Sequence, residues 1–246
     1  MTVRKFTSSL KLPTLSLLLS TLIFALTLDI LRGGASVWSI LLIVAYAVYV
    51  YVTRMNSSIH VPALYGALIA SAIIGVAAVP WGIGAGVVIA FFSTLFFLVV
   101  GVASLQFIHP KMALSVFFYL VLFAICVYAS SYSIPVASIL TPFVLYVVLY
   151  ALTKEYVRFM QGAWNARLRV FSVGLSLLTA EVLWAGSLIS IGFLNVAALT
   201  LVFFITFLDT MMQVYDGSLT KQVVYKNAAL FGVCACALVV VPVLMG

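Results

Sequence analysis

A few acidic and amide side chains inside apolar runs are the residues of this sequence that could do chemistry. Glu181 lies at the midpoint of an apolar run over residues 170–192. A charged side chain at the centre of a membrane helix costs about 2.5–3.5 kcal/mol, so Glu181 must face protein or water, or be protonated. We expect a buried carboxyl that either fixes helix packing or binds a proton or cation on a transport path.

Asp209 and Gln213 form a second polar group, one helical turn apart toward the end of the apolar run 197–215. Residues four apart share one face of a helix. Such a face could coordinate a cation or line a gate. Because Lys221 and Lys226 follow in the adjoining polar segment, the pattern favours a salt-bridge network at the membrane interface.

No catalytic, cofactor or metal site is predicted. The chain has five acidic residues and two histidines, and it contains no HExxH, GxSxG, P-loop or GxGxxG motif. His60 and His109 stand beside prolines in short connections, without other ligands at metal-binding spacing. The three cysteines lie inside apolar runs, where they serve as small packing residues. We therefore expect a non-enzymatic protein.

The elements that must position these residues are transmembrane helices. Of the 246 residues, 66% are hydrophobic and 7% are charged, and the mean hydropathy is +1.32. A soluble domain is about 25% charged, so this composition excludes one. At roughly 20 residues per span, the sequence predicts a single all-α, polytopic membrane domain over residues 1–246 with about nine spans, or eight if one pair is re-entrant. The predicted spans are 13–31, 36–53, 61–79, 84–106, 112–130, 134–153, 170–192, 197–215 and 225–245.

Short connections and the placement of basic residues predict the topology. Tight hairpins are expected at Gly33-Gly34, Pro80–Gly82, Ser130–Ser133 and Asn195. With a cytoplasmic N-terminus and nine spans, every Lys and Arg except Arg32 falls on the cytoplasmic side. The C-terminus is then outside. The formal charge of +7 reflects these loops and does not indicate nucleic-acid binding.

Two stretches carry faces that suggest partners. In the run 170–192, small residues share the side of Glu181 and hydroxyl residues gather on the other, which predicts a central helix packed on both sides. Residues 154–169 predict a basic amphipathic helix on an anionic membrane surface. The alternatives are an extension of the sixth span or a docking surface for a protein. The candidate surface residues are Tyr156, Arg158, Trp164 and Arg167.

One part of the chain resembles a known group of proteins. The pattern Glu181-x-x-Trp184-x-x-Ser187, a following apolar span, then Gly217–Thr220 and Tyr225 resembles uncharacterised small bacterial multi-spanning membrane proteins. The resemblance covers about residues 175–230. It implies a bacterial inner-membrane setting and no particular activity.

These observations favour a scaffold or packing subunit of a membrane assembly. Its partners would be the lipid bilayer and other membrane proteins or further copies of the chain. The alternative is a small-solute or proton-coupled transporter that uses a buried carboxylate at Glu181. A water-accessible crevice at Glu181 would favour transport, and a dry packing site with Ser and Thr partners would favour the scaffold.

Overall fold

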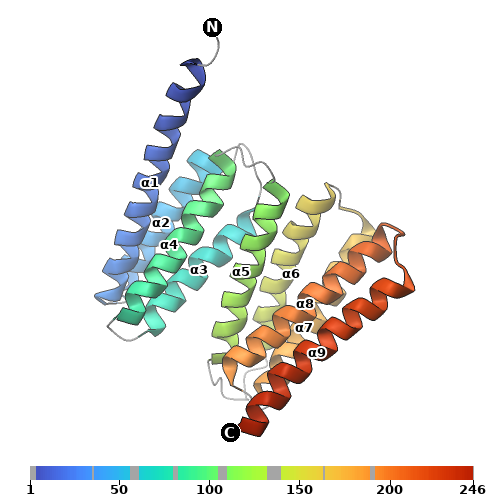
Figure 1. Cartoon of the computed structure of the whole chain (residues 1–246). Helices are drawn as coiled ribbons and strands as arrows, with labels where there is room; N and C mark the ends of the chain where they lie inside the picture. The colour runs from blue at the N-terminus through green and yellow to red at the C-terminus, as the bar shows by residue number, and fades with distance from the viewer. Residues whose placement is uncertain are drawn as a thin grey trace. The chain divides into compact units, whose positions relative to one another are not determined.

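A computed structural model describes residues 4–34, 36–55, 61–79, 83–104, 110–131, 140–162, 164–188 and 192–245. This described part of the chain is helical and contains no strand (Figure 1). Its elements are α1 (Arg4–Arg32), α2 (Val37–Val50), the π-helix η1 (Tyr51–Met55), α3 (Pro62–Ala78), α4 (Ile83–Ser104), α5 (Pro110–Ser131), α6 (Leu140–Gln161), α7 (Ala166–Ser187), α8 (Phe193–Tyr215) and α9 (Lys221–Met245). The predicted all-α class is thus confirmed.

Six of the described helices are long and apolar enough to cross a membrane, namely α1, α4, α5, α7, α8 and α9. The segments Val37–Thr53 and Pro62–Ala78 are shorter apolar helices. A spanning helix needs about 20 predominantly apolar residues, because its backbone must satisfy its own hydrogen bonds across a core about 30 Å thick. The chain therefore has the helices of a membrane-embedded protein.

Some predicted boundaries differ from the observed ones. Helix α6 runs to Gln161, beyond the predicted end at 153, and α7 covers 166–187 where 170–192 was predicted. Asn195 is not a connection, because it lies inside α8 and the chain turns at Gly192, whose φ of 82° favours glycine. The predicted connection at Pro80–Gly82 and both histidines lie outside the described residues.

The chain divides into two compact units, residues 1–117 and 118–246. In the first unit, α1 packs against α2, α3 and α4. Aromatic rings link three of these elements and η1. Phe24 of α1 stacks on Phe96 of α4 at 4.2 Å between ring centroids, Phe96 lies 6.0 Å from Tyr65 of α3, and Tyr65 lies 5.5 Å from Tyr51 of η1.

Two sets of hydrogen bonds also stabilise the first unit. The Tyr65 hydroxyl donates to the carbonyl of Ala47 at 3.0 Å, which ties α3 to α2. Ser36 caps α2 through a reciprocal capping box with Ser39, so the backbone N–H groups of Ser36 and Ser39 each have a side-chain acceptor. The first unit is therefore held by aromatic packing inside and by a local cap at the start of α2.

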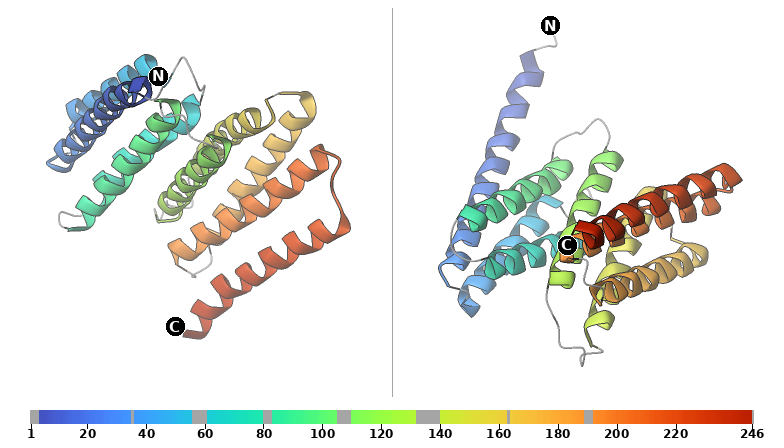
Figure 2. Two further views of the ribbon diagram at one scale, coloured as in Figure 1. Left: turned by 45° about the horizontal axis from the view of Figure 1, so that its top comes forward. Right: turned by 60° about the horizontal axis from the view of Figure 1, so that its bottom comes forward.

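In the second unit, α6, α7, α8 and α9 pack in chain order, each on the next (Figure 2, left). Phe118 of α5 joins them, since its ring stacks on Tyr156 of α6 at 4.4 Å and lies 5.7 Å from Phe204 of α8. The Ser130 hydroxyl of α5 donates to the carbonyl of Phe193 in α8 at 3.0 Å. Among the described helices, α7 and α8 each pack on two neighbours, whereas α6 packs on α7 and α9 packs on α8.

The predicted surface helix over 154–169 is wrong, because the chain breaks within it. Gly162 has a φ of 67°, a left-handed conformation that ends α6. Asn165 then starts α7 as its N-cap, and its side chain accepts a hydrogen bond from the backbone N–H of Leu168 at 2.9 Å. The alternative of an extended sixth helix is the observed one.

Candidate functional site

Glu181 lies on the exposed face of α7 and not on the face that packs in the second unit. No hydrogen bond or ion pair joins it to another described residue. It is also off the midpoint of the helix, because α7 ends six residues later at Ser187. We expected a carboxyl buried at the middle of its helix. Within the second unit, Glu181 is instead exposed and lies near the end of α7.

Small residues near Glu181 also lie on this open face. A Cβ added at Gly174 would meet no atom within 4 Å, and Ala185 is exposed. Gly192, the small residue at the end of the predicted run 170–192, lies beyond the end of α7. Helix α7 therefore packs on its neighbours through one side only, in contrast to the predicted central helix.

The hydroxyl face of α7 is the packed one, as the sequence predicts. Ser172, Ser176 and Thr179 are each no more than 1% exposed. The Ser176 hydroxyl donates to the carbonyl of Ser172 at 2.7 Å and lies 3.3 Å from the Thr153 hydroxyl of α6. Thr153 in turn donates to the carbonyl of Leu149 at 2.7 Å. These bonds satisfy the hydroxyls of Ser176 and Thr153 inside an apolar contact, as membrane helices require.

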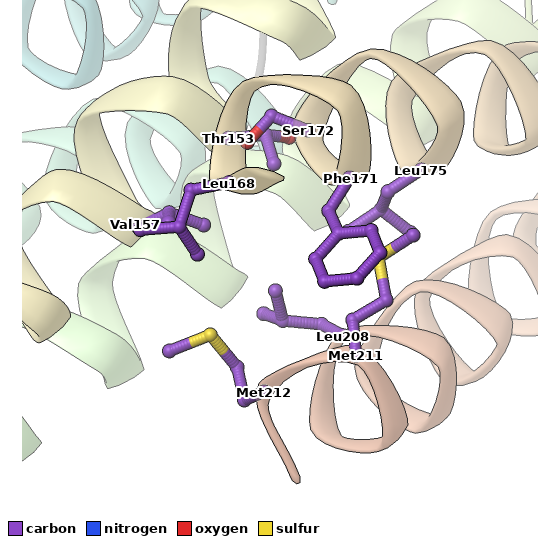
Figure 3. Close-up of a pocket in the computed structure, with 9 residues that line it drawn as sticks. All are labelled: Thr153, Val157, Leu168, Phe171, Ser172, Leu175, Leu208, Met211 and Met212. Carbon is purple, nitrogen blue, oxygen red and sulfur yellow. The ribbon is translucent and has the colours of Figure 1, made fainter. Parts of the chain in front are cut away.

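A small cavity lies beside this hydroxyl contact (Figure 3). Thr153 and Ser172 stand next to each other at its wall, and the other lining residues are apolar: Val157, Leu168, Phe171, Leu175, Leu208, Met211 and Met212. Its volume is about 10 Å³, which is the space of at most one water molecule. The Ser172 hydroxyl is buried without a partner among the described residues, so it is the polar atom that a water here would meet. The cavity is too small for a solute.

Asp209 and Gln213 lie together as predicted, and a residue of α9 joins them. The carboxylate oxygen Oδ2 of Asp209 accepts from Nε2 of Gln213 and from Nδ2 of Asn227, both at 2.9 Å. Nδ2 of Asn227 also lies 3.0 Å from the Thr210 hydroxyl. Asn227 is 8% exposed, although most of α9 around it faces outward. We call Asp209, Thr210, Gln213 and Asn227 the α8–α9 amide cluster.

The predicted salt bridges of this region are absent from the described residues. Lys221 and Lys226 are exposed and neither forms an ion pair with Asp209. Asp216 instead accepts a hydrogen bond at 3.4 Å from Nε2 of Gln161 at the end of α6. The amide groups of Asn227 and Gln213 take the place next to Asp209 because a helical register puts them, and not the lysines, beside it.

The four candidate membrane-surface residues have different environments. Tyr156 is 6% exposed, and its hydroxyl lies 3.3 Å from that of Tyr119, so it belongs to the core and not to a surface. Arg158 and Arg167 are exposed, whereas Trp164 is half-buried with the Lys154 ammonium 6.0 Å from its ring centroid. Arg158 and Arg167 therefore lie at the surface, as expected, whereas Tyr156 does not.

An apolar groove marks the first unit, between α2, η1 and α3. Its volume is about 360 Å³. Its lining is Val44, Ala47, Val48, Tyr51, Pro62, Tyr65, Gly66, Ile69, Ala70 and Ile73. The volume suits a small ligand, and the lining is hydrocarbon apart from the phenol hydroxyls of Tyr51 and Tyr65.

No cluster in the described residues has the composition of a metal site. Groups of three or more His, Cys, Asp or Glu side chains that could hold a metal ion are not found there.

No family model, curated protein or solved structure matches this chain.

Two positions that matter in the structure were missed by the sequence analysis. Asn227 was overlooked although it is an amide inside an apolar run, which is the signal that could have found it. Gly186 is a close approach of α7 to α8, since a Cβ there would lie 2.8 Å from Cγ1 of Val196. A glycine seven residues from another small residue is common in membrane helices, so sequence alone does not single it out.

Replacement of Asn227 by leucine is expected to loosen α9 from α8. The change removes the amide that bridges Asp209 and Thr210, and we expect a loss of about 1 kcal/mol in unfolding free energy, because Asp209 is exposed and regains other partners. Thermal unfolding of the purified protein in detergent, followed by tryptophan fluorescence, measures the loss. Gln222→Leu removes an exposed amide of the same helix and should leave the midpoint unchanged. Equal effects of the two changes would contradict the role of the cluster.

Proposed function

We propose that this chain is a non-enzymatic scaffold subunit of a membrane assembly. The observation that carries the proposal is the division of α7 into two faces. Its hydroxyl face is buried against α6 with a cavity of about 10 Å³, and Glu181 lies on the opposite, exposed face. A face that is packed and nearly dry joins helices, and a face that carries an unpaired carboxyl among apolar residues is suited to meeting another protein.

The transport hypothesis would need a water-filled path to Glu181. The cavity lined by Thr153 and Ser172 lies on the other side of α7 and admits at most one water. Asp209, the other candidate for a path, is engaged with two amide groups on the second unit's surface. These observations support the scaffold over the transporter.

The charge distribution supports a cytoplasmic location for one end of the second unit. The end of α6, the start of α7 and the start of α9 carry its cations: Lys154, Arg158, Arg167, Arg169, Lys221 and Lys226. The opposite helix ends carry no Lys or Arg in the described residues. Excess Lys and Arg marks cytoplasmic loops. We therefore infer that this end faces the cytoplasm and that the protein lies in a bacterial inner membrane. The N-terminus is then cytoplasmic and the C-terminus is outside.

The size of the assembly in native lipid tests the scaffold. Membranes from the natural host are extracted with a polymer that keeps the lipids, and the tagged chain is purified and weighed by native mass spectrometry. We expect a particle that contains other polypeptides in fixed ratio with the 26.6 kDa chain. A single chain surrounded only by lipid, together with a proton or solute flux into liposomes that is lost in Glu181→Gln, would replace the scaffold by the transporter.

A further inference from the structure

The exposed face of α7 is apolar from Val170 to Trp184 except for the carboxylate of Glu181. Leu177 and Leu178, one turn before Glu181, are 47% and 37% exposed, and Trp184, one turn after it, is 52% exposed. No described residue forms a hydrogen bond or ion pair with the carboxylate. The face therefore combines an apolar surface with one acidic group that the second unit leaves without a partner.

Glu181 lies at a depth where lipid does not satisfy a carboxylate. It follows Arg169, a residue of the basic end, by twelve positions, which is about 18 Å along a helix that rises about 1.5 Å per residue. A hydrocarbon core is about 30 Å thick. Acidic groups at such depth face a protein interior or pair with another group.

We propose that this face binds a transmembrane helix of another membrane protein that carries a lysine or arginine at the depth of Glu181. The proposal rests on the proposed scaffold function and names the chemistry of its partner. A basic side chain supplies both the counter-charge and the N–H donors that the carboxylate lacks. Leu177 and Trp184 supply the apolar contact on either side, and Trp is enriched in such interfaces.

The backbone near Glu181 permits close approach of the partner helix. Gly174 lies seven residues before Glu181 and has open space where a Cβ would be, and the exposed Ala185 lies four residues after it. Small residues at this spacing let two helices approach until polar side chains meet. The same face thus offers room for a helix and a charge for it to neutralise.

A second copy of the chain does not supply the required cation. The Lys and Arg residues of the second unit stand in the halves of their helices toward the basic end, and the deepest of them, Lys154, has its ammonium 6.0 Å from the Trp164 ring of its own chain. Arg32 is paired with Asp29 of its own helix at 3.6 Å. A two-fold axis along the membrane normal would place Glu181 at the same depth as Glu181 of the other copy. Like charges repel, so the partner is a different chain.

Site-specific crosslinking in the natural host tests the interface. A photo-crosslinking phenylalanine derivative replaces Leu178 of the full chain, and a matched chain carries it at Val233, an exposed position of α9. We expect the Leu178 product to map to a transmembrane segment with a lysine or arginine. Glu181→Leu should lower its yield at least tenfold at equal amounts of chain in the membrane, without changing products from Val233. Glu181→Lys combined with an acidic replacement of the partner's cation should restore the yield.

The outcomes separate this proposal from the scaffold function. A product with a second copy, with residues 1–117 of the same chain or with lipid alone overturns the partner, as does the absence of a product or a yield that Glu181→Leu leaves unchanged. If the native particle still contains other polypeptides in those cases, the scaffold stands and only this interface fails. If the wild-type chain is alone with lipid, both fail.

Discussion

Replacement of Phe24 by alanine is expected to destabilise the first unit by about 2 kcal/mol. Phe24 is fully buried and stacks on Phe96 with an angle of 9° between the rings. The unfolded chain remains in lipid or detergent, so the loss comes from packing more than from transfer into water. A cavity of roughly 100 Å³ at about 24 cal/mol per Å³ gives this magnitude.

A neighbouring position of the same helix provides the control for Phe24. Leu26 is 55% exposed, and its replacement by alanine opens no cavity inside the unit. Denaturant unfolding in mixed micelles measures both variants through the free energy of unfolding. If Leu26→Ala costs as much as Phe24→Ala, the stacked ring pair is not the centre of the first unit, and its aromatic packing would have to be revised.

Replacement of Gly186 by alanine is expected to destabilise the second unit by about 1–3 kcal/mol, against the usual helix preference. Alanine in a helix interior is normally favoured over glycine by about 0.5–1 kcal/mol. At Gly186 the new Cβ would meet Cγ1 of Val196 at 2.8 Å, and valine has little freedom to move its methyl groups. Overpacking therefore outweighs propensity.

Two further variants separate overpacking from propensity. Gly174→Ala adds a Cβ into open space on the same helix, so we expect no loss or a small gain in stability. Val196→Ala removes the opposing methyl groups and should recover most of the stability that Gly186→Ala loses. Unfolding free energies of the single and double variants form a double-mutant cycle. Additive effects in that cycle would show that Gly186 and Val196 do not contact each other.

The helices follow from the sequence because their apolar runs are long and their breakers are strong. The runs around Phe24, Phe118 and Phe204 all became helices, as predicted. The predicted end at 192 for the seventh span was wrong, since the residues after Ser187 are apolar and hydropathy cannot separate a turn from a helix there. Helix ends depend on the backbone conformation of single residues, such as Gly162 and Asn165. The composition of the sequence does not predict that conformation.

The candidate residues could be located by sequence, but their neighbours could not. The spacing of Asp209 and Gln213 fixes their contact within one helix, whereas the contact with Asn227 depends on how α9 packs on α8. The hydroxyl face of α7 was predicted and is buried, but both faces of that helix looked equally unsuited to lipid. Only tertiary packing decides that Ser176 points inward and Glu181 outward.

A cysteine scan along α7 tests most directly whether the chain joins helices or conducts a solute. Cys126, Cys234 and Cys236 are first replaced by alanine, and single cysteines then replace residues 172 to 185 in intact membranes. A charged maleimide that cannot cross the bilayer reports water. We predict no labelling at Ser176 or Glu181, and strong labelling of a control cysteine at the exposed Arg167. Labelling that recurs every third or fourth residue and includes position 176 or 181 would reveal an aqueous path and contradict the scaffold.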